Sequence, residues 1–383
     1  MLEIFWRFLI LGLTSFGGPA AHIGYFRQTF VEKLHWLDSE HYHRLIALSQ
    51  FLPGPGSSQI GFAIGLQRGG LAGGITAFIA FTLPSFFLLY ALAIGLQTSE
   101  VLKLDGLIHG LKLLALVVIL DAIWSMWRSF CHQTLTRIIA STTAIVLLLI
   151  PSFFIQVALL LLMSLVGVVF LRQSPPQQTQ TDDEKFSLSG KLWLALTLLL
   201  FALSLFDWQH AALELFAEFY QAGSLVFGGG HVVLPLLQQT LGERLSTDSF
   251  LTAYAAAQAV PGPMFTLSAY LGADSLPSSP LSGALIATLA IFLPGFLLVL
   301  ALHDHWQNLA QKPRFAGAVI AINASVVGFL IATLIQPVAP SALMHWPDII
   351  AALLGIYLLI FRRLSVFWLI LLFSAYGVLG GLI

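Results

Sequence analysis

Long apolar segments follow one another along this chain with only short polar breaks between them. Residues 138–171, for example, hold no charged side chain, and about 20 apolar residues in a helix are enough to cross a bilayer. Only 9% of the 383 residues are charged, whereas a water-soluble domain carries roughly 25%. The sequence therefore predicts a membrane protein and excludes an ordinary soluble enzyme.

Backbone groups inside a bilayer must find hydrogen-bond partners within the protein, so only helix bundles and closed barrels span it. The apolar runs do not alternate with polar residues as barrel strands do. The predicted fold is all-α, a polytopic membrane helix bundle of about thirteen elements. These are expected near residues 4–26, 45–66, 71–96, 106–127, 136–150, 152–171, 190–206, 211–239, 250–272, 281–302, 315–336, 347–361 and 364–382.

The composition excludes several further functions. A formal net charge of −1 offers no basic surface for nucleic acid. Cys131 is the only cysteine, which excludes a disulfide framework, a cysteine-based zinc cluster and an iron–sulfur centre. We expect neither a metal nor a cofactor, and the lipid bilayer as the surroundings. The first apolar run lacks a basic flank, which favours an uncleaved first span over a signal peptide.

One stretch, residues 173–185, is rich in proline, glutamine and charge and too polar to pack into a membrane. It divides the chain near its middle. Three regions are therefore expected: an N-terminal repeat over residues 1–172, a polar linker with one connecting helix over 173–210, and a C-terminal repeat over 211–383.

The two halves carry the same landmarks in the same order, 208 to 211 residues apart, which indicates an internal duplication. Seven elements precede the second half, so the halves enter from opposite faces, as an inverted repeat, if every element spans. The matching segments are Phe16-Gly17-Gly18 with Phe227-Gly228-Gly229, His22 with His231, Gln50-Phe51-Leu52-Pro53-Gly54-Pro55 with Gln258-Ala259-Val260-Pro261-Gly262-Pro263, and Leu83-Pro84 with Leu293-Pro294.

The basic residues give a test of this topology, because loops rich in Lys and Arg favour the cytoplasmic side. With the N-terminus in the cytoplasm and the C-terminus outside, most of them fall inside. Lys103 and the loop that holds Arg27, Lys33 and Arg44 fall outside, against the rule. Either the charge bias is imperfect there, or the first two elements do not both cross the bilayer.

Paired glycines, Gly17-Gly18 and Gly228-Gly229, interrupt otherwise helical runs. Lipid cannot pair the freed N–H groups, so such backbone persists only beside a cavity or inside protein. The amino end of a half-helix also attracts anions. Close packing of two helices on small residues is the alternative. The duplication favours the cavity, as in transporters whose broken helices meet at a repeat interface.

The two Pro-Gly-Pro motifs, residues 53–55 and 261–263, mark a second break in each half. Two prolines remove two N–H donors, fix two φ angles and end the preceding helix. Hydroxyl groups follow each motif and an amide precedes it, and a buried amide needs hydrogen-bond partners. The pattern indicates a site for an anion with several oxygens, with a simple kink or hinge as the alternative. The polar residues are Gln50, Ser57 and Ser58 in the first half and Gln258, Thr266 and Ser268 in the second.

Two histidines and one lysine complete the candidate residues. His22 and His231 follow the glycine breaks, where a histidine can couple protons, donate to an anion or fill a structural role. A metal site is disfavoured because no carboxylate or cysteine stands at ligand spacing. Lys112 lies inside a span, where a charge needs a cavity or a partner, so it either lines an anion path or forms a structural ion pair. Its matching position in the second half is Asn323.

Together, Phe16-Gly17-Gly18 with His22, Trp36-Leu37, the segment from Gln50 to Pro55 and the second-half copies closely resemble the chromate ion transporter family. The resemblance covers nearly the whole chain apart from the linker. It implies a two-domain transporter of the bacterial inner membrane that exports chromate from the cytoplasm, with sulfate as a related oxyanion. The family motifs carry over to Gly17, Gly18, His22, Gln50, Pro53, Gly54, Pro55, Gly228, Gly229, His231, Gln258, Pro261, Gly262 and Pro263, to which the residue chemistry adds Ser57, Ser58, Lys112 and Thr266.

The main hypothesis is alternating access, with an oxyanion held between the repeats by N–H groups and hydroxyls, and a coupling ion or proton driving its exit. A passive channel, or a carrier of sulfate or another oxyanion, stays open, as does a homo-oligomer. The competing class is an intramembrane hydrolase with Ser57 as nucleophile and His22 or His231 as base. Ser57 has no matching hydroxyl at Phe265, and a duplicated site suits transport better than catalysis.

Overall fold

The computed structural model describes residues 1–98, 105–171, 188–242, 244–303 and 313–380. These ranges form helices and short connections without a strand among them, so the all-α prediction is confirmed. Five of the described helices are long and apolar enough to cross a membrane. They are Gly56–Leu96, Asp105–Phe130, Phe153–Phe170, Pro280–Leu302 and Pro313–Ala342.

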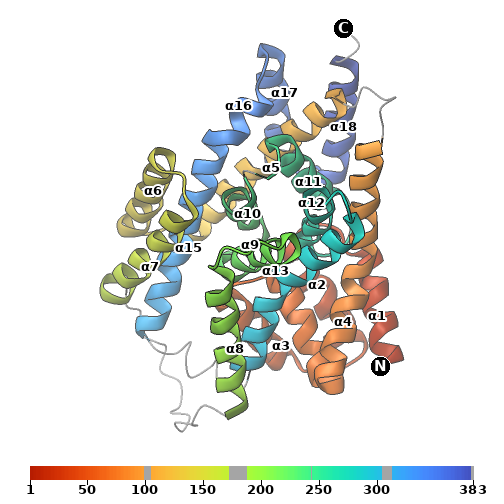
Figure 1. Cartoon of the computed structure of the whole chain (residues 1–383), viewed down its shortest axis with the longest axis vertical. Coiled ribbons are helices and arrows are strands. Elements are labelled where there is room, and N and C mark those ends of the chain that lie inside the picture. Colours follow the sequence, from red (N-terminus) through yellow and green to blue (C-terminus); the bar gives the residue numbers. More distant parts are fainter. Residues whose placement is uncertain (99–104, 172–187, 243, 304–312, 381–383) are drawn as a thin grey trace.

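The helices follow the predicted elements closely, and Figure 1 shows their arrangement. The first half comprises α1 (Leu2–Thr14), α2 (Gly18–Phe26), a π-helical turn (Arg27–Lys33), α3 (Ser39–Phe51), α4 (Gly56–Thr98), α5 (Asp105–Phe130), α6 (Thr134–Leu149) and α7 (Phe153–Phe170), and α8 (Leu188–Ser204) leads into the second half. The second half comprises α9 (Ala211–Leu225), η2 (Gly230–Val232), α10 (Val233–Leu241), α11 (Thr247–Ala259), η3 (Met264–Thr266), α12 (Leu267–Ser275), α13 (Pro280–Leu302), α15 (Pro313–Thr333), η4 (Leu334–Val338), α16 (Ala339–Ala342), α17 (Trp346–Ile356), η5 (Tyr357–Phe361) and α18 (Val366–Gly380).

The first two predicted elements are hairpins that return to the face from which they start. The chain breaks at residues 15–17 and again at 52–55, and the 13-residue helices α1 and α3 are each only about 20 Å long. The open ends of both hairpins lie together. Arg68, at the end of the second hairpin, has its Nη2 3.8 Å from Oε2 of Glu3, at the start of the first. Its guanidinium lies 5.1 Å from the centre of the ring of Trp36, which lies between the two hairpins. Of the two alternatives that the charge pattern leaves open, this geometry favours the one in which the first two elements do not both cross the bilayer.

The second half repeats this construction. Arg244 Nη2 lies 2.7 Å from Glu214 Oε2 and 3.4 Å from Glu218 Oε1, which ties the start of α9 to the loop after α10. The helices α3 and α11 are matching elements, 208 residues apart at both ends, and each begins with a side-chain cap. Asp38 accepts the N–H of His41 at 2.7 Å, and Ser246 accepts the N–H of Ser249 at 3.1 Å.

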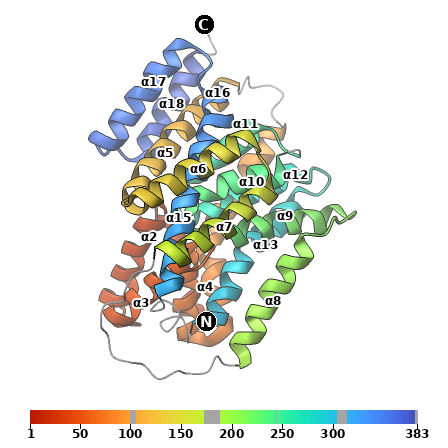
Figure 2. The ribbon, with the colours of Figure 1, turned by 90° about the vertical axis from the view of Figure 1, so that its left-hand side faces the viewer.

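Each half also packs a helix of the other, as Figure 2 shows. Helix α5 lies along α18, and α15 lies along α7. Gly106 of α5 meets the backbone at Gly377, and Gly317 of α15 meets the backbone at Gly167, because glycines let two helix backbones approach closely. Gly106 and Gly317 occupy matching positions, as do Gly167 and Gly377, so the two contacts are related by an approximate two-fold axis.

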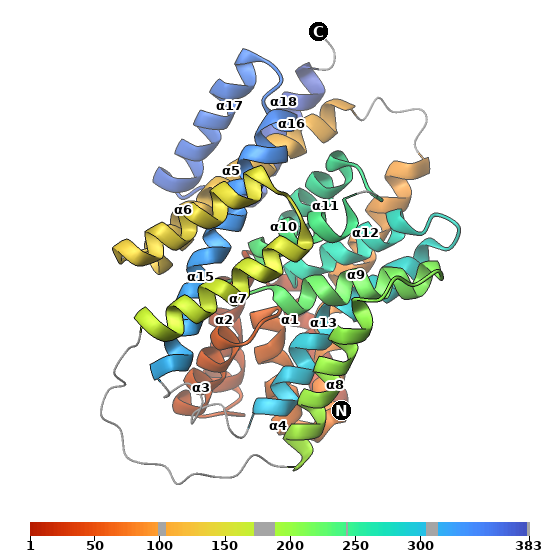
Figure 3. The same cartoon turned by 60° about the vertical axis from the view of Figure 1, so that its left-hand side comes forward.

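The predicted linker at residues 173–185 lies outside the described residues. Helix α8 follows it and packs against α9 and α13 (Figure 3). Seven elements precede the second half. If the two hairpins do not cross the bilayer, five crossings remain, which is still an odd number. The halves are therefore predicted to have opposite orientations whether or not the hairpins cross. The boundaries between the three regions stay a prediction.

Candidate functional site

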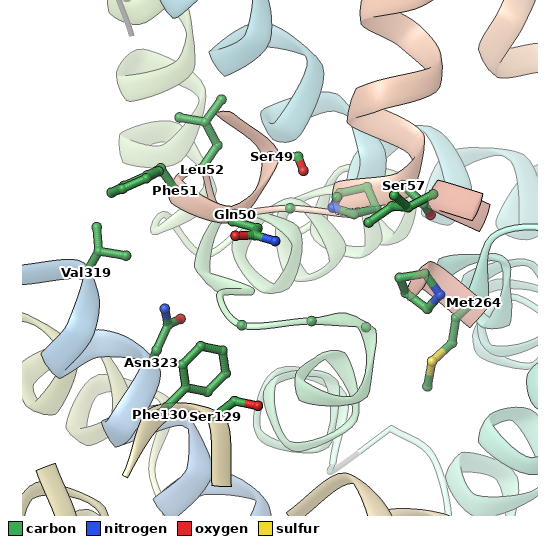
Figure 4. Close-up of a pocket in the computed structure, with 18 of the residues that line it drawn as sticks. Ser49, Gln50, Phe51, Leu52, Ser57, Ser129, Phe130, Met264, Val319 and Asn323 are labelled. Atoms are coloured by element: carbon green, nitrogen blue, oxygen red, sulfur yellow. The ribbon is translucent and has the colours of Figure 1, made fainter. Parts of the chain in front are cut away.

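A cavity of about 530 Å³ lies between the two halves. Its walls come from the turn between α3 and α4, the start of α2, the break after α9, the end of α5 and the first turns of α15. Figure 4 shows Gln50, Phe130 and Asn323 around the same space. Among the predicted residues, those that line it are Gln50, Gly54, Pro55, Ser57, Gly228, Gly229 and Pro263.

The breaks of the two halves meet because each Pro-Gly-Pro turn is hydrogen-bonded to the other half. The Gly54 N–H donates to the Val226 carbonyl at 2.7 Å, and the Gly262 N–H donates to the Ser15 carbonyl at 3.0 Å. Val226 and Ser15 directly precede the two Phe-Gly-Gly segments. These reciprocal bonds satisfy backbone groups that lipid could not pair, and they hold both pairs of broken helices together at the centre of the molecule.

The glycines of these breaks adopt backbone angles that other residues rarely take. Gly54 has φ +120°, and a Cβ there would lie 3.0 Å from the Cα of Gly295 on α13. Only glycine allows both this left-handed conformation and the close approach of the other half. The other predicted glycines, all of which also have positive φ, are Gly17, Gly18, Gly228, Gly229 and Gly262.

The amino end of α4 faces the cavity. Gly56 and Ser57 line it, and the first N–H groups of an α-helix have no acceptor within the helix. The preceding turn is held by Gln59, whose Nε2 donates to the Pro53 carbonyl at 2.9 Å and to the Gly295 carbonyl at 3.3 Å. The positive end of the helix dipole therefore points into the cavity, which is suitable for an anion.

His22 lies directly behind Ser57. Its Nδ1 is 3.2 Å from Ser57 Oγ and its Nε2 is 3.2 Å from the Ser15 carbonyl oxygen. The imidazole is fully buried and packs edge-on against Phe81. Because a carbonyl only accepts, Nε2 must carry a proton, so in a neutral ring Nδ1 accepts the hydroxyl proton of Ser57. His22 therefore orients Ser57 and does not itself line the cavity.

The matching polar residues of the second half are paired with protein atoms. His231 Nδ1 lies 2.6 Å from Tyr254 Oη, and Gln258 Nε2 lies 3.3 Å from Met264 Sδ. Thr266 Oγ1 donates to the Pro263 carbonyl at 2.6 Å and is fully buried. The two halves thus contribute unequally to the cavity.

The remaining predicted residues lie outside the cavity wall. Gly17, Gly18, Pro53, Pro261 and Gly262 shape the breaks, and Ser58 is buried behind them with an unpartnered Oγ. Lys112 lies far from this cavity. Its Nζ is 3.0 Å from Asp248 Oδ1, and it lines a second cavity at the opposite end of α5.

Several lining residues were not predicted from the sequence. Ser49, Ser129 and Phe130 belong to none of the predicted motifs. Asn323 is identified from the sequence only as the position that matches Lys112. Asn323 is 7% exposed and lines the cavity, and its Oδ1 is buried without a hydrogen-bond partner. Among the described residues that line the cavity, none carries a formal charge. The alignment of the repeats was the signal that could have identified Asn323.

The chain matches the model of the family described as "Chromate transporter" twice, over residues 2–170 and 213–379. A "Chromate transport protein" of Pseudomonas aeruginosa is 28% identical over 87% of this chain and 80% of its own length. One of Cupriavidus metallidurans with the same description is 26% identical over 94% of this chain and 88% of its own length. An "Uncharacterized transporter" of Methanocaldococcus jannaschii is 24% identical over 99% of this chain and 94% of its own length. No solved structure matches the chain.

Proposed function

The chain belongs to the chromate transporter family, and from that premise we propose that it carries chromate across the membrane through the cavity between its halves. One observation carries the proposal. The amino end of α4 and the glycine break after α9 come from opposite halves and meet at an uncharged cavity. Membrane embedding follows from the long apolar helices.

Neutral donors are suited to an anion that must also leave. Chromate is a tetrahedral dianion with four acceptor oxygens, and the helix amino ends supply N–H groups with partial positive charge. Ser57, Gln50 and Asn323 add side-chain donors. A buried arginine in an empty cavity would leave an uncompensated charge, which costs several kcal/mol. Sulfate has the same shape and charge and is the related substrate.

We propose a proton as the coupling ion, taken up by His22. When the imidazole is neutral, it accepts the Ser57 hydroxyl proton, and Ser57 then offers only lone pairs to the cavity. When the imidazole is protonated, both ring nitrogens donate. Ser57 then accepts from His22 and turns its own proton toward the cavity, where it donates to the oxyanion. Proton uptake and anion binding thereby favour each other.

The proposed direction is efflux from the cytoplasm by alternating access. An inside-negative potential is worth about 2.3 kcal/mol per elementary charge and 100 mV, and it drives chromate and its proton, with a net charge of −1, outward together. Two halves of opposite orientation provide two related arrangements of the same helices, with the site between them.

A hydrolase is the second candidate, because Ser57 Oγ and His22 Nδ1 lie 3.2 Å apart at a cavity, as a nucleophile and its base do. Replacing Ser57 by alanine separates the two functions. A hydrolase would lose all activity, whereas the proposed transporter should keep chromate flux at reduced affinity.

Chromate flux into sealed proteoliposomes tests the proposed function. Wild-type protein should accumulate chromate when a proton gradient or a membrane potential is applied. The double variant Gln50→Ala with Asn323→Ala removes two cavity amides and should lower the flux at least roughly tenfold, since each lost hydrogen bond to a charged group is worth ~1.5–3 kcal/mol. Ile145→Ala, on the outer surface, is the control. Protein-dependent flux absent under every condition would refute the proposal.

A further inference from the structure

A second cavity of about 950 Å³ lies at the opposite end of α5. It is lined by the first turns of α5, the start of α11, the segment before α17 and the end of α18. Lys112 lines it, while Ser129 of the same helix lines the first cavity. Seventeen residues of helix separate the two, which is roughly 25 Å.

The second cavity is the repeat-related counterpart of the first. Four positions of α5 that line it match four positions of α15 that line the first cavity, each pair being 211 residues apart. The pairs are Asp105 with Ala316, Ile108 with Val319, His109 with Ile320 and Lys112 with Asn323. The same wall of the two-fold arrangement is therefore present twice, once near each end of α5.

The helices that face α5 and α15 across the two cavities, α11 and α3, are placed differently. Helix α11 packs along α5, whereas its counterpart α3 makes only marginal backbone contact with α15, and the first cavity lies between them. Between α5 and α11, Lys112 Nζ lies 3.0 Å from Asp248 Oδ1. Asp248 matches Glu40, 208 residues earlier, which instead pairs with Arg44 on its own helix.

We infer that the second cavity is a further oxyanion site, in which Lys112 is the binding cation and Asp248 occupies the place of the anion in this structure. This inference rests on the proposed function. The Lys112 side chain is only 6% exposed, while that of Asp248 is 50% exposed. A buried ammonium requires an anionic partner, but that partner need not be Asp248. An arriving oxyanion replaces the carboxylate, which turns to water, and the charge on Lys112 stays compensated.

The second carboxylate inside this cavity, that of Asp348, already has its own partners. Asp348 Oδ1 lies 2.9 Å from His109 Nε2 and accepts the Tyr376 hydroxyl at 2.8 Å. Its Oδ2 accepts the backbone N–H groups of Met344 and His345 at 3.0 and 2.8 Å. Asp348 therefore has four donors of its own and does not compete for Lys112. Asp105 lies at the rim of the cavity and is exposed.

Two single-cysteine reporters test the inference in a Cys131→Ser background. Ile108→Cys reports on the second cavity and Val319→Cys on the first, through their rates of maleimide labelling. Molybdate is the probe, because it is a tetrahedral dianion that does not oxidise thiols as chromate does. Asp248→Asn should allow molybdate to protect position 108 at a concentration at least roughly tenfold lower, since the carboxylate that competes for Lys112 is removed.

Asp248→Asn and Lys112→Met are expected to change the protection of position 108 in opposite directions. If the ion pair were only structural, the two variants would have the same effect. Lys112→Met should abolish protection at 108, and Lys112→Arg should keep it. Glu40→Gln, which removes the matching charge of the other repeat, should leave protection at 108 unchanged. A gain on Asp248→Asn cannot come from misfolding. If Asp248→Asn and Lys112→Met change protection alike, or if position 319 is protected and 108 never is, the second site is refuted. Protection at neither position in any variant would count against the proposed function as well.

Discussion

His22 illustrates how much a single residue depends on its neighbours. Its place after the glycine break was evident from the sequence, but its role follows from two contacts that only the fold provides. The Ser15 carbonyl fixes which nitrogen carries the proton, and Ser57 receives or supplies the other hydrogen. The motif therefore identified a residue that acts on the cavity through Ser57.

This geometry predicts a pH-dependent affinity. A protonated His22 frees the Ser57 hydroxyl to donate, so chromate affinity of the wild-type protein should rise as the pH falls. His22→Gln keeps an N–H donor for Ser15 and an acceptor for Ser57 but cannot take up a proton. Because burial disfavours the charged imidazole, the measurement extends from about pH 4 to 8, and chromate binding to the variant should lose this component.

Chromate itself takes up a proton in this range, so the ratio of the variant's affinity to that of wild type is the informative quantity. The ratio should be near one at high pH and should fall as the pH falls. A ratio that stays constant with pH would leave His22 with a structural role only.

At the scale of elements, glycines allow helices of the two halves to pack with their backbones in close contact. A Cβ at Gly317 would lie 2.9 Å from the Leu171 carbonyl and would also strike the backbone at Gly167. These neighbours are backbone atoms of α7 and its end, which cannot rotate away. The sequence marked many glycines, but which of them face another helix depends on the packing.

We therefore predict that Gly317→Ala separates α15 from α7 and lowers the melting temperature of the detergent-solubilised protein by several degrees, as overpacking by about 1–3 kcal/mol would. Gly95→Ala is the matched control, since a Cβ there meets nothing within 4 Å. It should leave the melting temperature unchanged or raise it slightly, because alanine favours a helix over glycine by ~1 kcal/mol. Equal melting temperatures for the two variants would contradict the packing role of Gly317.

At the scale of the whole molecule, the hairpins change the topology that hydropathy suggested. The contact of Arg68 with Glu3 and Trp36 places the loop after α2 at the same face as the N-terminus. Arg27, Lys33 and Arg44 then lie on that face too, and these three residues no longer contradict the charge rule. The loop that holds Arg244 moves to the other face.

Labelling of intact cells tests this topology. In a Cys131→Ser background, Glu40→Cys should resist a membrane-impermeant maleimide added outside and react after the cells are opened. Asp207→Cys, in the loop between α8 and α9, should react from outside without opening. Reaction of Glu40→Cys from outside would restore two full crossings before α4 and refute the hairpin arrangement.

The sequence by itself determined the solvent, the secondary structure, the duplication and the positions of the breaks. Those follow from local properties: apolar length, backbone angles available only to glycine, and the missing donor of proline. The tertiary structure decided that the broken elements turn back, that Gly54 and Gly262 each bond across the halves, and that Lys112 lies with Asp248 far from the first cavity. A break in a helix has the same sequence whether the chain continues or reverses, and these contacts, which join residues 136 to 247 positions apart, are formed only when both halves fold together.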